Sequence, residues 1–401
     1  MYINRILEKE LLKYINKREI LAVIGSRQCG KTTLLKHIFS SLKDAVFLDF
    51  GDRQTLELFT EDTDSFISLY VKKYRYVFID EFQYAKDGGK ILKYIYDSSK
   101  TKLIISGSSA TELSIQSIKH LVGRIFVFNL HPLSFEEYIS YKNPDLLKVM
   151  RTEISSALAK KIMPFFHDFC IYGGYPRVVL ADDNEEKEVI LRNIYSTYFL
   201  KEIKETLNLP SDYKLSRLLN ALSLQIGNMI NYNELSSLTG FRHPELLSYL
   251  NILEKTFICI RSRPYYTNKR TELVKSPKIF FYDNGFRNIV LKNFQPLENR
   301  QDKGSLYENF AATELAKKQL EIRYWRTKSK AEIDFIVEKN GRIIPIEIKS
   351  AIPKITKSML SFIEHYRPKK AIVLSEHSSS KKSIKNTHVI SAPVFAVSNM
   401  L

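Results

Sequence analysis

Apolar residues recur at two spacings along the chain, and together these spacings predict alternating strands and helices in its first third. Short continuous apolar runs predict strands buried on both faces of a parallel sheet, at 20–24, 45–48, 76–79 and 103–105. Apolar side chains three or four residues apart predict helices at 5–16 and 33–39. Because strands and helices alternate, the pattern favours an α/β domain with a parallel sheet over residues 1–145.

Helical spacing dominates the next part of the chain, and we expect residues 146–210 to form a helical lid on the first domain. In residues 211–300 three expected helices precede two strand-like runs, an order typical of a winged-helix domain. From residue 301 to 401 a helix precedes strands, which predicts a last α/β domain with strands at 321–326, 332–337, 342–349 and 370–374. A basic, serine-rich stretch at 378–385 is expected to be a loop.

Composition and charge limit the cellular location and the partners that we expect for the protein. No apolar run reaches the roughly 18 residues needed to cross a bilayer, and the first residues show no hydrophobic signal core, so we expect a cytoplasmic protein without a membrane partner. The three cysteines lie far apart, which argues against a zinc ribbon or a disulfide framework. The formal net charge of +17 favours anionic partners such as nucleic acid. Residues 301–401 hold 18 basic and 10 acidic side chains, so the excess is concentrated there.

A glycine-containing loop links the first expected strand to the helix at 33–39. Its sequence matches the phosphate loop G-x-x-x-x-G-K-[ST] and consists of Gly25, Ser26, Arg27, Gln28, Cys29, Gly30, Lys31 and Thr32, with Thr33 opening the helix. Glycines let the backbone curl so that its N–H groups point inward, and such a nest at a helix N-terminus attracts phosphate. Lys31 is expected to reach the β- and γ-phosphates of ATP and to assist catalysis, and the Thr32 hydroxyl to bind Mg²⁺. An ordinary glycine turn is the alternative.

The strand at 76–79 ends in two acids, Asp80 and Glu81. In a parallel sheet the carboxyl end of a strand faces the crevice in which ligands bind. Asp80 is therefore expected to hold Mg²⁺ through water, and Glu81 to act as general base on the attacking water. The alternative is an acid pair that points into solvent at the end of a strand.

Two further features are candidates for the same site. Ser106 and Ser108 end the strand at 103–105 and could sense the γ-phosphate, although plain turn chemistry explains them equally well. Arg124 is a candidate for stabilising transition-state charge, either in its own chain or toward a neighbouring subunit of a homo-oligomer. A solvated surface arginine is the alternative for Arg124.

These motifs carry a resemblance to a known family. The phosphate loop, the Asp-Glu-Phe-Gln sequence that ends at Gln83, the Ser-Gly-Ser-Ser-Ala run to Ala110, the Gly123-Arg124 pair and the stretch 131–138 together resemble the AAA-type (AAA_14) ATPases of archaea and bacteria that carry a C-terminal DUF4143 region. The resemblance implies a P-loop α/β domain, then a winged-helix segment, then a domain similar to restriction endonucleases. It covers nearly the whole chain and implies architecture more than a cellular role.

The loop between the two strand-like runs of residues 211–300 is basic and aromatic. It and its flanks carry Arg261, Arg263, Lys269, Arg270 and Lys275 together with Tyr265 and Tyr266. Basic residues interleaved with aromatic ones suit a nucleic-acid backbone, so DNA is a candidate partner of this wing. Winged-helix modules that bind proteins, and basic loops that are merely solvated, are equally strong alternatives.

Four polar residues of the last domain match the PD-(D/E)xK nucleases in type and order. Glu308 lies on the expected helix, Asp334 near the start of one strand, and Glu347 and Lys349 on one face of the next. By that resemblance Glu308, Asp334 and Glu347 would bind Mg²⁺, and Lys349 would orient the attacking water. A Glu-Ile-Asp sequence replaces the usual Pro-Asp pair. The alternative is a nuclease-like fold that binds without cutting.

Two functions follow from these features. In the first, an ATPase is coupled to DNA binding or processing through the winged-helix and nuclease-like domains. In the second, ATP controls a switch or scaffold whose nuclease-like domain is inactive and binds a protein partner. Both require ATP and Mg²⁺ at the phosphate loop, so the loss of Lys31 is expected to stop ATP hydrolysis in either case.

Overall fold

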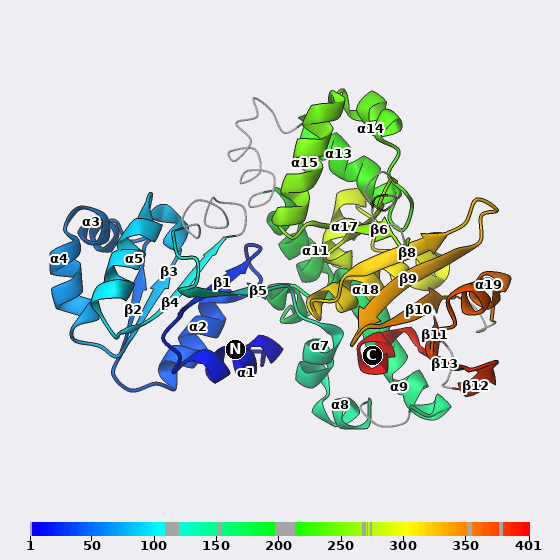
Figure 1. The fold of residues 1–401 in the computed structure, drawn as a ribbon, viewed down its shortest axis with the longest axis horizontal. Coiled ribbons are helices and arrows are strands. Elements are labelled where there is room, and N and C mark those ends of the chain that lie inside the picture. Colours follow the sequence, from blue (N-terminus) through cyan, green and yellow to red (C-terminus); the bar gives the residue numbers. More distant parts are fainter. Residues whose placement is uncertain are drawn as a thin grey trace. The chain divides into compact units, whose positions relative to one another are not determined.

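The computed structural model describes residues 2–108, 120–150, 154–196, 213–266, 270, 272, 275–350, 355–376 and 380–401. The chain divides into two compact units (Figure 1): among the described residues, the first comprises 2–133 and 255–257, and the second comprises the others. The first unit therefore ends before residue 145, and residues 134–150 belong to the second. None of the helices in these described ranges is long and apolar enough to cross a membrane.

The first unit is built on a five-stranded sheet in which every pair of neighbouring strands is parallel. The strands are β1 (Ile20–Gly25), β2 (Ala45–Asp49), β3 (Tyr76–Asp80), β4 (Lys102–Ser108) and β5 (Ile125–Leu130), in the spatial order β2-β3-β4-β1-β5. The parallel sheet predicted from the apolar runs is confirmed. Because β4 lies between β1 and β3, the loop after β1 and the acids that end β3 flank the carboxyl end of β4.

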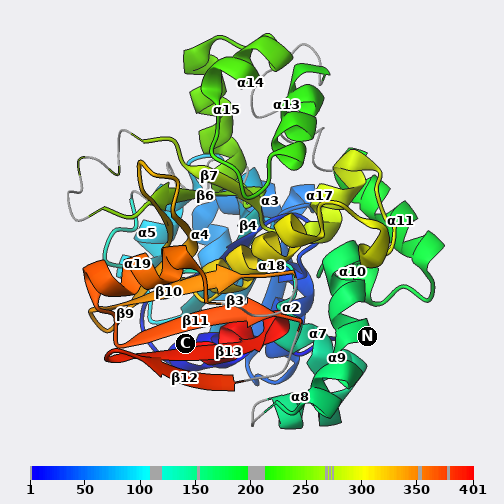
Figure 2. The ribbon, with the colours of Figure 1, turned by 90° about the vertical axis from the view of Figure 1, so that its right-hand side faces the viewer.

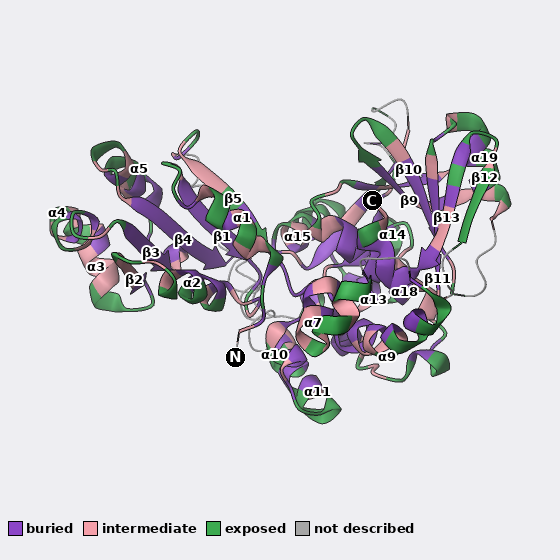
Figure 3. Cartoon of the chain, turned by 90° about the horizontal axis from the view of Figure 1, so that it is seen from below, coloured by how far each residue is buried: buried purple, intermediate pink, exposed green. Residues whose placement is uncertain are grey.

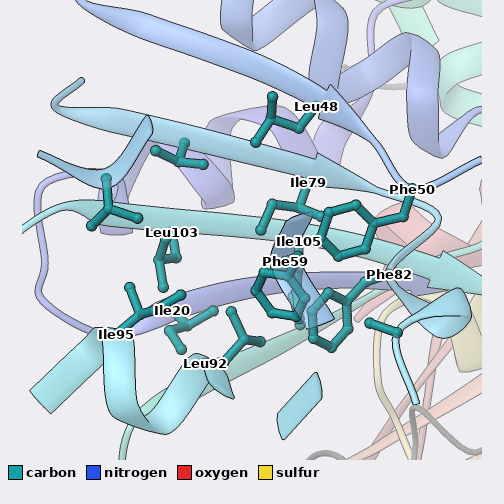
Figure 4. Close-up of a cluster of buried hydrophobic side chains, with 14 of the residues drawn as sticks. Ile20, Leu48, Phe50, Phe59, Ile79, Phe82, Leu92, Ile95, Leu103 and Ile105 are labelled. Atoms are coloured by element: carbon teal, nitrogen blue, oxygen red, sulfur yellow. The ribbon is translucent and has the colours of Figure 1, made fainter. Parts of the chain in front are cut away.

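Helices of the first unit accompany two apolar cores, one for each face of the sheet. These elements are α1 (Ile6–Tyr14), α2 (Lys31–Ser40), α3 (Arg53–Glu61), α4 (Thr63–Phe66), the π-helix η1 (Ile67–Val71), the 3-10 helix η2 (Phe82–Tyr84) and α5 (Gly88–Ser98). Along β1 the side chains alternate: Ile20 and Ile24 join the core that includes α3 and α5, drawn in Figure 4, and Leu21 and Val23 join the core that includes α1 and α2.

The second unit begins with helices. They are α7 (Phe135–Lys142), α8 (Pro144–Met150), α9 (Ser156–Tyr172), α10 (Pro176–Val179), α11 (Asn184–Asn193), α13 (Tyr213–Leu224), α14 (Tyr232–Thr239), α15 (His243–Lys255), α17 (Asn284–Leu291) and the 3-10 helix η5 (Leu297–Asn299). The three helices expected within residues 211–253 are present as α13, α14 and α15. Gly240 ends α14 in the left-handed conformation (φ 71°), as a glycine at a helix C-terminus commonly does.

A mixed eight-stranded sheet forms the rest of the second unit (Figure 2). Its strands are β6 (Cys259–Pro264), β7 (Lys278–Phe281), β8 (Ile322–Arg326), β9 (Glu332–Lys339), β10 (Arg342–Ile348), β11 (Lys370–Ser375), β12 (Ser380–Ile384) and β13 (Thr387–Pro393). The spatial order is β12-β13-β11-β10-β9-β8-β6-β7. The accompanying helices are α18 (Lys303–Lys317), α19 (Lys357–Tyr366) and the 3-10 helix η6 (Val394–Met400).

Two features of this sheet differ from the expectations. The hairpin β6–β7, which the sequence pattern places with the winged helix, continues the C-terminal sheet because β6 pairs with β8, with Arg263 opposite Arg323. The stretch expected as a serine-rich loop contains β12, which pairs with β13 at the edge of the sheet. Figure 3 shows β12 exposed while the central strands are buried. An exposed edge strand needs no apolar alternation, which is why its lysines and serines read as a loop.

Candidate functional site

The loop between β1 and α2 is shaped by its two glycines for different reasons. Gly30 has a φ of 97°, a left-handed conformation that glycine adopts without strain. At Gly25 the requirement is close approach, because a Cβ there would lie 2.2 Å from the carbonyl oxygen of Leu130 on β5. The loop therefore turns sharply while staying packed against the sheet, which puts the N-terminus of α2 directly after it.

Lys31, the first residue of α2, is folded back over this loop. Its Nζ donates hydrogen bonds to the carbonyl oxygens of Gly25 (3.0 Å) and Ser26 (2.9 Å), and the side chain is 7% exposed. Thr32 is half-buried and Thr33 is exposed at the start of the same helix. The fold thus gathers an ammonium group, a hydroxyl and a helix N-terminus, which is the set of groups that the phosphate-loop motif requires.

Two other residues of the loop have buried polar atoms without a hydrogen-bond partner in the described part of the chain. These atoms are Ser26 Oγ and Gln28 Oε1. Gln28 also adopts a positive φ of 60°. Arg27 is exposed and Cys29 is fully buried in the apolar core under the loop, so Cys29 fills space. Buried polar atoms without partners are uncommon, and a ligand rich in oxygen and hydrogen-bonding groups would satisfy Ser26 and Gln28.

An arginine ahead of the sheet holds the loop from behind, and the sequence pattern did not reveal it. Arg5 donates from one guanidinium nitrogen to the carbonyl oxygen of Cys29 (2.8 Å) and from the other to that of His131 (2.6 Å). Its side chain is buried. Arg5 therefore connects the phosphate loop to the residue that follows β5, with charge-assisted bonds that are stronger than neutral ones. Nothing in an amphipathic helix pattern marks its first arginine for this role.

The two acids predicted at the end of β3 differ in their surroundings. Asp80 is buried, and its Oδ1 accepts hydrogen bonds from the backbone N–H of Glu81 (3.1 Å) and from the Ser106 hydroxyl. Ser106 lies on β4, the strand next to β3, so the neighbouring strand orients the carboxylate. Glu81 is only partly buried and has a positive φ of 53°. A positive φ is unusual for a glutamate and often marks a functional site.

Gln83 connects Glu81 to the end of β4. Its Nε2 donates to the Glu81 carboxylate, and its Oε1 accepts from the backbone N–H of Ser108 (3.1 Å). Ser108 thus contributes its backbone to this network, while Ser109 and Ala110 lie outside the described residues. The orientation of Glu81 therefore depends on an amide that bridges the end of β3 and β4. The sequence indicates Gln83 only as part of the motifs that carry the resemblance, and it does not reveal this contact.

The position of Arg124 excludes its predicted role at the phosphate loop of its own chain. Its backbone carbonyl accepts from the N–H of Ile20, so it lies at the amino end of β1, whereas the phosphate loop follows the carboxyl end. Its guanidinium pairs with both carboxylate oxygens of Asp97, at 2.9 Å and 3.3 Å. A strand of this length spans roughly 15–20 Å, so Arg124 does not reach the loop of its own chain. The role toward a neighbouring subunit stays a prediction.

A cluster of charges in the second unit contains the four residues predicted for the nuclease-like site. Glu308 on α18 and Asp334 on β9 influence each other electrostatically, and Asp334 also interacts with Glu347 and Lys349. Burial, and then repulsion from Asp334, raises the pKa of Glu308 to about 8. Burial also raises the pKa of Asp334 to about 6. Neither carboxyl group therefore holds its charge as readily as a solvated acid does.

A fifth residue, Lys278, joins this cluster from the hairpin. Lys278 on β7 is buried, its Nζ lies 2.5 Å from Glu332 Oε1, and its charge acts on Glu308 and Asp334. The sequence pattern did not assign it, because it precedes Glu308 in a segment read as part of the winged helix. The pairing of β6 with β8 is what brings β7 to this end of the sheet.

The carboxylates of this cluster are occupied by internal partners. Asp334 Oδ2 accepts from the N–H of Ile348 (2.7 Å), while Glu347 binds Lys349 (2.8 Å) through one oxygen and the Thr356 hydroxyl (2.7 Å) through the other. Within the described residues, no three His, Cys, Asp or Glu side chains are grouped so that they could hold one metal ion. The residues present do not form a metal cage in this structure, and the metal set of Glu308, Asp334 and Glu347 stays a prediction.

The basic and aromatic residues expected on the wing differ in their surroundings. Arg261 is bound to Glu254 (2.9 Å through Nε), and Tyr265 packs edge-on against Tyr366. Lys269 lies outside the described residues, while Arg263 and Arg270 are exposed. The remaining two, Tyr266 and Lys275, line a cavity described below.

Comparison with protein families matches the chain in three consecutive parts. Residues 17–139 match an AAA domain (AAA_14). Residues 163–297 match a domain of unknown function, DUF8612, and residues 303–395 match another, DUF4143. The first and third matches confirm the resemblance drawn from the motifs. The second spans the boundary expected at residue 210.

Two relatives that match along most of the chain are described as uncharacterized proteins. A protein of Haemophilus influenzae is 27% identical over 370 residues, covering 87% of this chain and 86% of the relative. A protein of Methanocaldococcus jannaschii is 24% identical over 347 residues, covering 84% and 75%. Among solved structures, the Aeropyrum pernix ORC1 protein in complex with DNA aligns with a TM-score of 0.26 and 11% identity, over 78% of this chain and 94% of that one. The Saccharomyces cerevisiae Hsp104–ADP complex aligns with a TM-score of 0.31 and 17% identity, over 63% and 49%.

Proposed function

We propose that this chain, which carries an AAA domain followed by DUF8612 and DUF4143 regions, binds and hydrolyses ATP with Mg²⁺ in its first unit and couples hydrolysis to nucleic-acid binding by its second. One observation carries the first half of this proposal. Lys31 bridges the carbonyl oxygens of the loop after β1, and the buried Asp80 ends β3 on the far side of β4. A phosphate-loop lysine and a buried acid at these two places are elements that nucleoside triphosphatases use.

Particular residues are suited to hold the nucleotide. The backbone N–H groups of residues 25–33 and the ammonium of Lys31 would bind phosphate oxygens, while Thr32 and Asp80 would hold Mg²⁺. Mg²⁺ supplies neutralisation of the phosphate charge when it is bound. The unpartnered Ser26 Oγ supports this fit, because a hydroxyl buried in the loop would gain a phosphate oxygen as acceptor.

Glu81 is the candidate base for the attacking water. Its carboxylate lies one residue beyond the buried Asp80, and Gln83 holds one of its oxygens. The carboxylate would accept the proton of the water while Gln83 keeps it oriented. Ser106 acts on Asp80 rather than on Glu81, so we propose that Ser106 orients the metal-holding acid. The sensing of γ-phosphate by Ser106 and Ser108 is part of the same proposal.

ATP turnover by purified protein tests the first unit. Lys31→Ala is expected to abolish hydrolysis and weaken ATP binding, and Glu81→Gln to abolish hydrolysis while ATP still binds. Lys43→Ala serves as control because Lys43 is exposed and lies beyond the end of α2. Hydrolysis by Lys31→Ala at the wild-type rate would overturn the proposal.

For the second unit we propose nucleic-acid binding without strand cleavage. The lysines of the charge cluster neutralise its carboxylates, and no three of those carboxylates are grouped for one metal ion in the described part of the chain. Incubation of supercoiled plasmid with the protein and Mg²⁺ tests this point. Intact plasmid is expected. If the wild type nicks the plasmid and Asp334→Ala does not, the second unit is a metal-dependent nuclease and this proposal is wrong.

A switch or scaffold that binds a protein partner is the second candidate. The engagement of Arg261 with Glu254 favours it, because a wing arginine held in an ion pair is less available to a phosphate backbone. Filter binding to DNA at several salt concentrations separates the two candidates. Binding that weakens steeply with salt supports nucleic acid, and absent or salt-independent binding supports the scaffold.

A further inference from the structure

A cavity of about 610 Å³ opens in the second unit where the helices α14 and α15 meet the β6–β7 end of the large sheet. Figure 2 shows α15 next to β6 and β7, with α14 farther from the sheet. Four separate segments line it: residues 229–233, the start of α15, the residues that flank the hairpin loop, and the end of β8 with the turn after it. Its volume lies within the roughly 300–1,000 Å³ of ligand-binding clefts, and is therefore large enough for a nucleotide.

Three cations and no acidic residue stand among the described residues that line the cavity. The cations are Lys275, Arg326 and Lys328. Lys275 and Lys328 are exposed, and the described residues give neither of them an acidic partner. Arg326 lies 3.5 Å from Glu332, which is shared with Lys278. At least two of the three cations are therefore available to an anionic ligand.

Three tyrosines face the same cavity. Tyr232 and Tyr266 are partly buried, whereas Tyr324 is buried and donates its hydroxyl to the Ser276 carbonyl (2.7 Å). Tyr324 is thus a fixed part of the wall. Within the described part of the chain, the hydroxyl groups of Tyr232 and Tyr266 donate no such bond, and the Tyr232 ring packs edge-on against His243 (5.4 Å between ring centres). Aromatic rings beside cations are the two elements that bind a base and its phosphate together.

We propose that this cavity binds single-stranded nucleic acid, with phosphate at Lys275, Arg326 and Lys328 and an unstacked base against Tyr232 or Tyr266. In a duplex the bases stack on one another and their faces are not available to tyrosine rings, so the single strand is the form that uses every group present. An acidic peptide would use the cations but not the ring faces. The inference rests on the nucleic-acid binding in the proposed function and assigns it a place and a form of substrate.

The structure also explains why the sequence indicates only part of this site, Tyr266 and Lys275. Tyr266 and Lys275 come from the hairpin loop, but Tyr324, Arg326 and Lys328 follow about fifty residues later, and Tyr232 precedes them all. The pairing of β6 with β8 brings these stretches to one end of the sheet. Only the fold makes them neighbours.

Fluorescence anisotropy with a labelled oligothymidylate tests the proposal. The wild type is expected to bind it more tightly than the matched duplex and to lose affinity as salt rises. The double variant Lys275→Ala/Lys328→Ala is expected to bind about tenfold more weakly, with a salt dependence lower by about two counterions. Tyr266→Leu is expected to bind about tenfold more weakly with the salt dependence unchanged, because it removes a ring but no charge.

Lys160→Ala is the matched control. Lys160 is exposed on α9 in the same unit, outside the cavity, and its loss is expected to leave oligothymidylate binding unchanged. Ultraviolet cross-linking followed by peptide mass spectrometry adds a location, and the cross-links are expected at Tyr266 or Tyr232. Equal affinity of wild type and both cavity variants would overturn the proposal, as would cross-links confined to other parts of the chain.

Two competition experiments distinguish nucleic acid from other anionic ligands, and a measurement of ATP hydrolysis distinguishes this inference from the proposed function. Displacement of the oligothymidylate by thymidine monophosphate at similar concentration would assign the cavity to a free nucleotide and overturn the nucleic-acid proposal. Displacement by polyglutamate that matches displacement by unlabelled oligothymidylate would assign it to an acidic protein. ATP hydrolysis is measured without nucleic acid. Hydrolysis without oligothymidylate binding overturns this inference alone, and binding without hydrolysis overturns the ATPase alone.

Discussion

The guanidinium of Arg5 donates a hydrogen bond of 2.8 Å to the carbonyl oxygen of Cys29, which ties the segment ahead of β1 to the phosphate loop. A second bond, to the carbonyl oxygen of His131, ties it to the segment after β5. The loop is thus held through the backbone of Cys29 by a side chain that is not among the predicted nucleotide-binding residues. The first prediction concerns the consequence of removing it.

Arg5→Met is expected to destabilise the first unit by about 3 kcal/mol, because it leaves two buried carbonyl groups without their charged donor. ATP is also expected to bind more weakly, since the loop loses its anchor. Thermal unfolding and titration with a fluorescent ATP analogue measure the two effects. Lys9→Met is the control, because Lys9 is exposed on the same helix. Unchanged stability and affinity in Arg5→Met would contradict the anchoring role.

Gln83→Ala is expected to lower kcat about tenfold while KM for ATP stays constant, because the hydrogen bonds of the Gln83 amide go to Glu81 and Ser108. Gln83→Glu is expected to lower kcat further, since two carboxylates would then repel. Steady-state kinetics over a range of ATP concentrations separates kcat from KM. A raised KM with kcat intact would instead assign Gln83 to nucleotide binding.

Arg124→Ala is expected to leave ATP affinity unchanged, because Arg124 lies at the opposite end of β1 from the phosphate loop. If Arg124 acts on a neighbouring subunit, kcat falls by on the order of 10³-fold, the lower end for a residue of this kind. Mixing Arg124→Ala protein with Glu81→Gln protein is then expected to recover activity, since each supplies what the other lacks. If Arg124→Ala is fully active by itself, Arg124 has no catalytic role and is a surface arginine that pairs with Asp97.

Lys278→Met is expected to destabilise the second unit by about 4 kcal/mol, because it leaves buried carboxylates without their cation. The variant keeps the length of the side chain, so the loss reports charge rather than packing. Urea unfolding in the presence of EDTA measures it. Lys381→Met, on the exposed edge strand β12, is the control. Unchanged stability of Lys278→Met would contradict a stabilising role for this buried charge.

The pH dependence of stability reports on the same cluster. The folded chain raises the pKa of Glu308 from 4.5 to about 8, chiefly because the group is removed from water. The folded state then binds the proton more tightly than the unfolded state does, so this stabilisation is complete below pH 4.5 and is lost as pH rises through about 8. Glu308→Gln is expected to flatten unfolding free energy between these pH values, measured in EDTA. Glu364→Gln, at an exposed glutamate paired with Lys385, is expected to keep the slope of the wild type.

The phosphate loop and the acids of β3 could be predicted because each depends on local sequence. A glycine loop between a strand and a helix, and an apolar run ending in Asp80 and Glu81, place their own residues at the carboxyl edge of a parallel sheet. Strand order is not local. The position of β4 between β1 and β3, which brings Ser106 to Asp80 and Gln83 to Ser108, follows from tertiary packing.

In the second unit, the residues of the charge cluster could not be grouped from local sequence. The helices α13 to α15 and the strands β8 to β10 follow from periodicity, but the partner of β6 does not, because any half-buried strand can pair with several others. The prediction therefore assigned Lys278 to one domain and Glu308 to another, although their charges interact. Arg261 was expected to face nucleic acid, and its carboxylate partner on α15 comes into contact only when the chain folds.

The backbone bonds between β6 and β8 have a mechanical consequence. The amide of Asn309 on α18 also clamps Phe281 on β7, accepting from its N–H at 2.7 Å and donating to its carbonyl at 3.0 Å. A fragment that stops at residue 300 would lose both attachments and leave an unpaired strand prone to aggregation. In the whole chain, a partner that binds α15 and displaces it would also act on the C-terminal strands, because the hairpin β6–β7 connects the two.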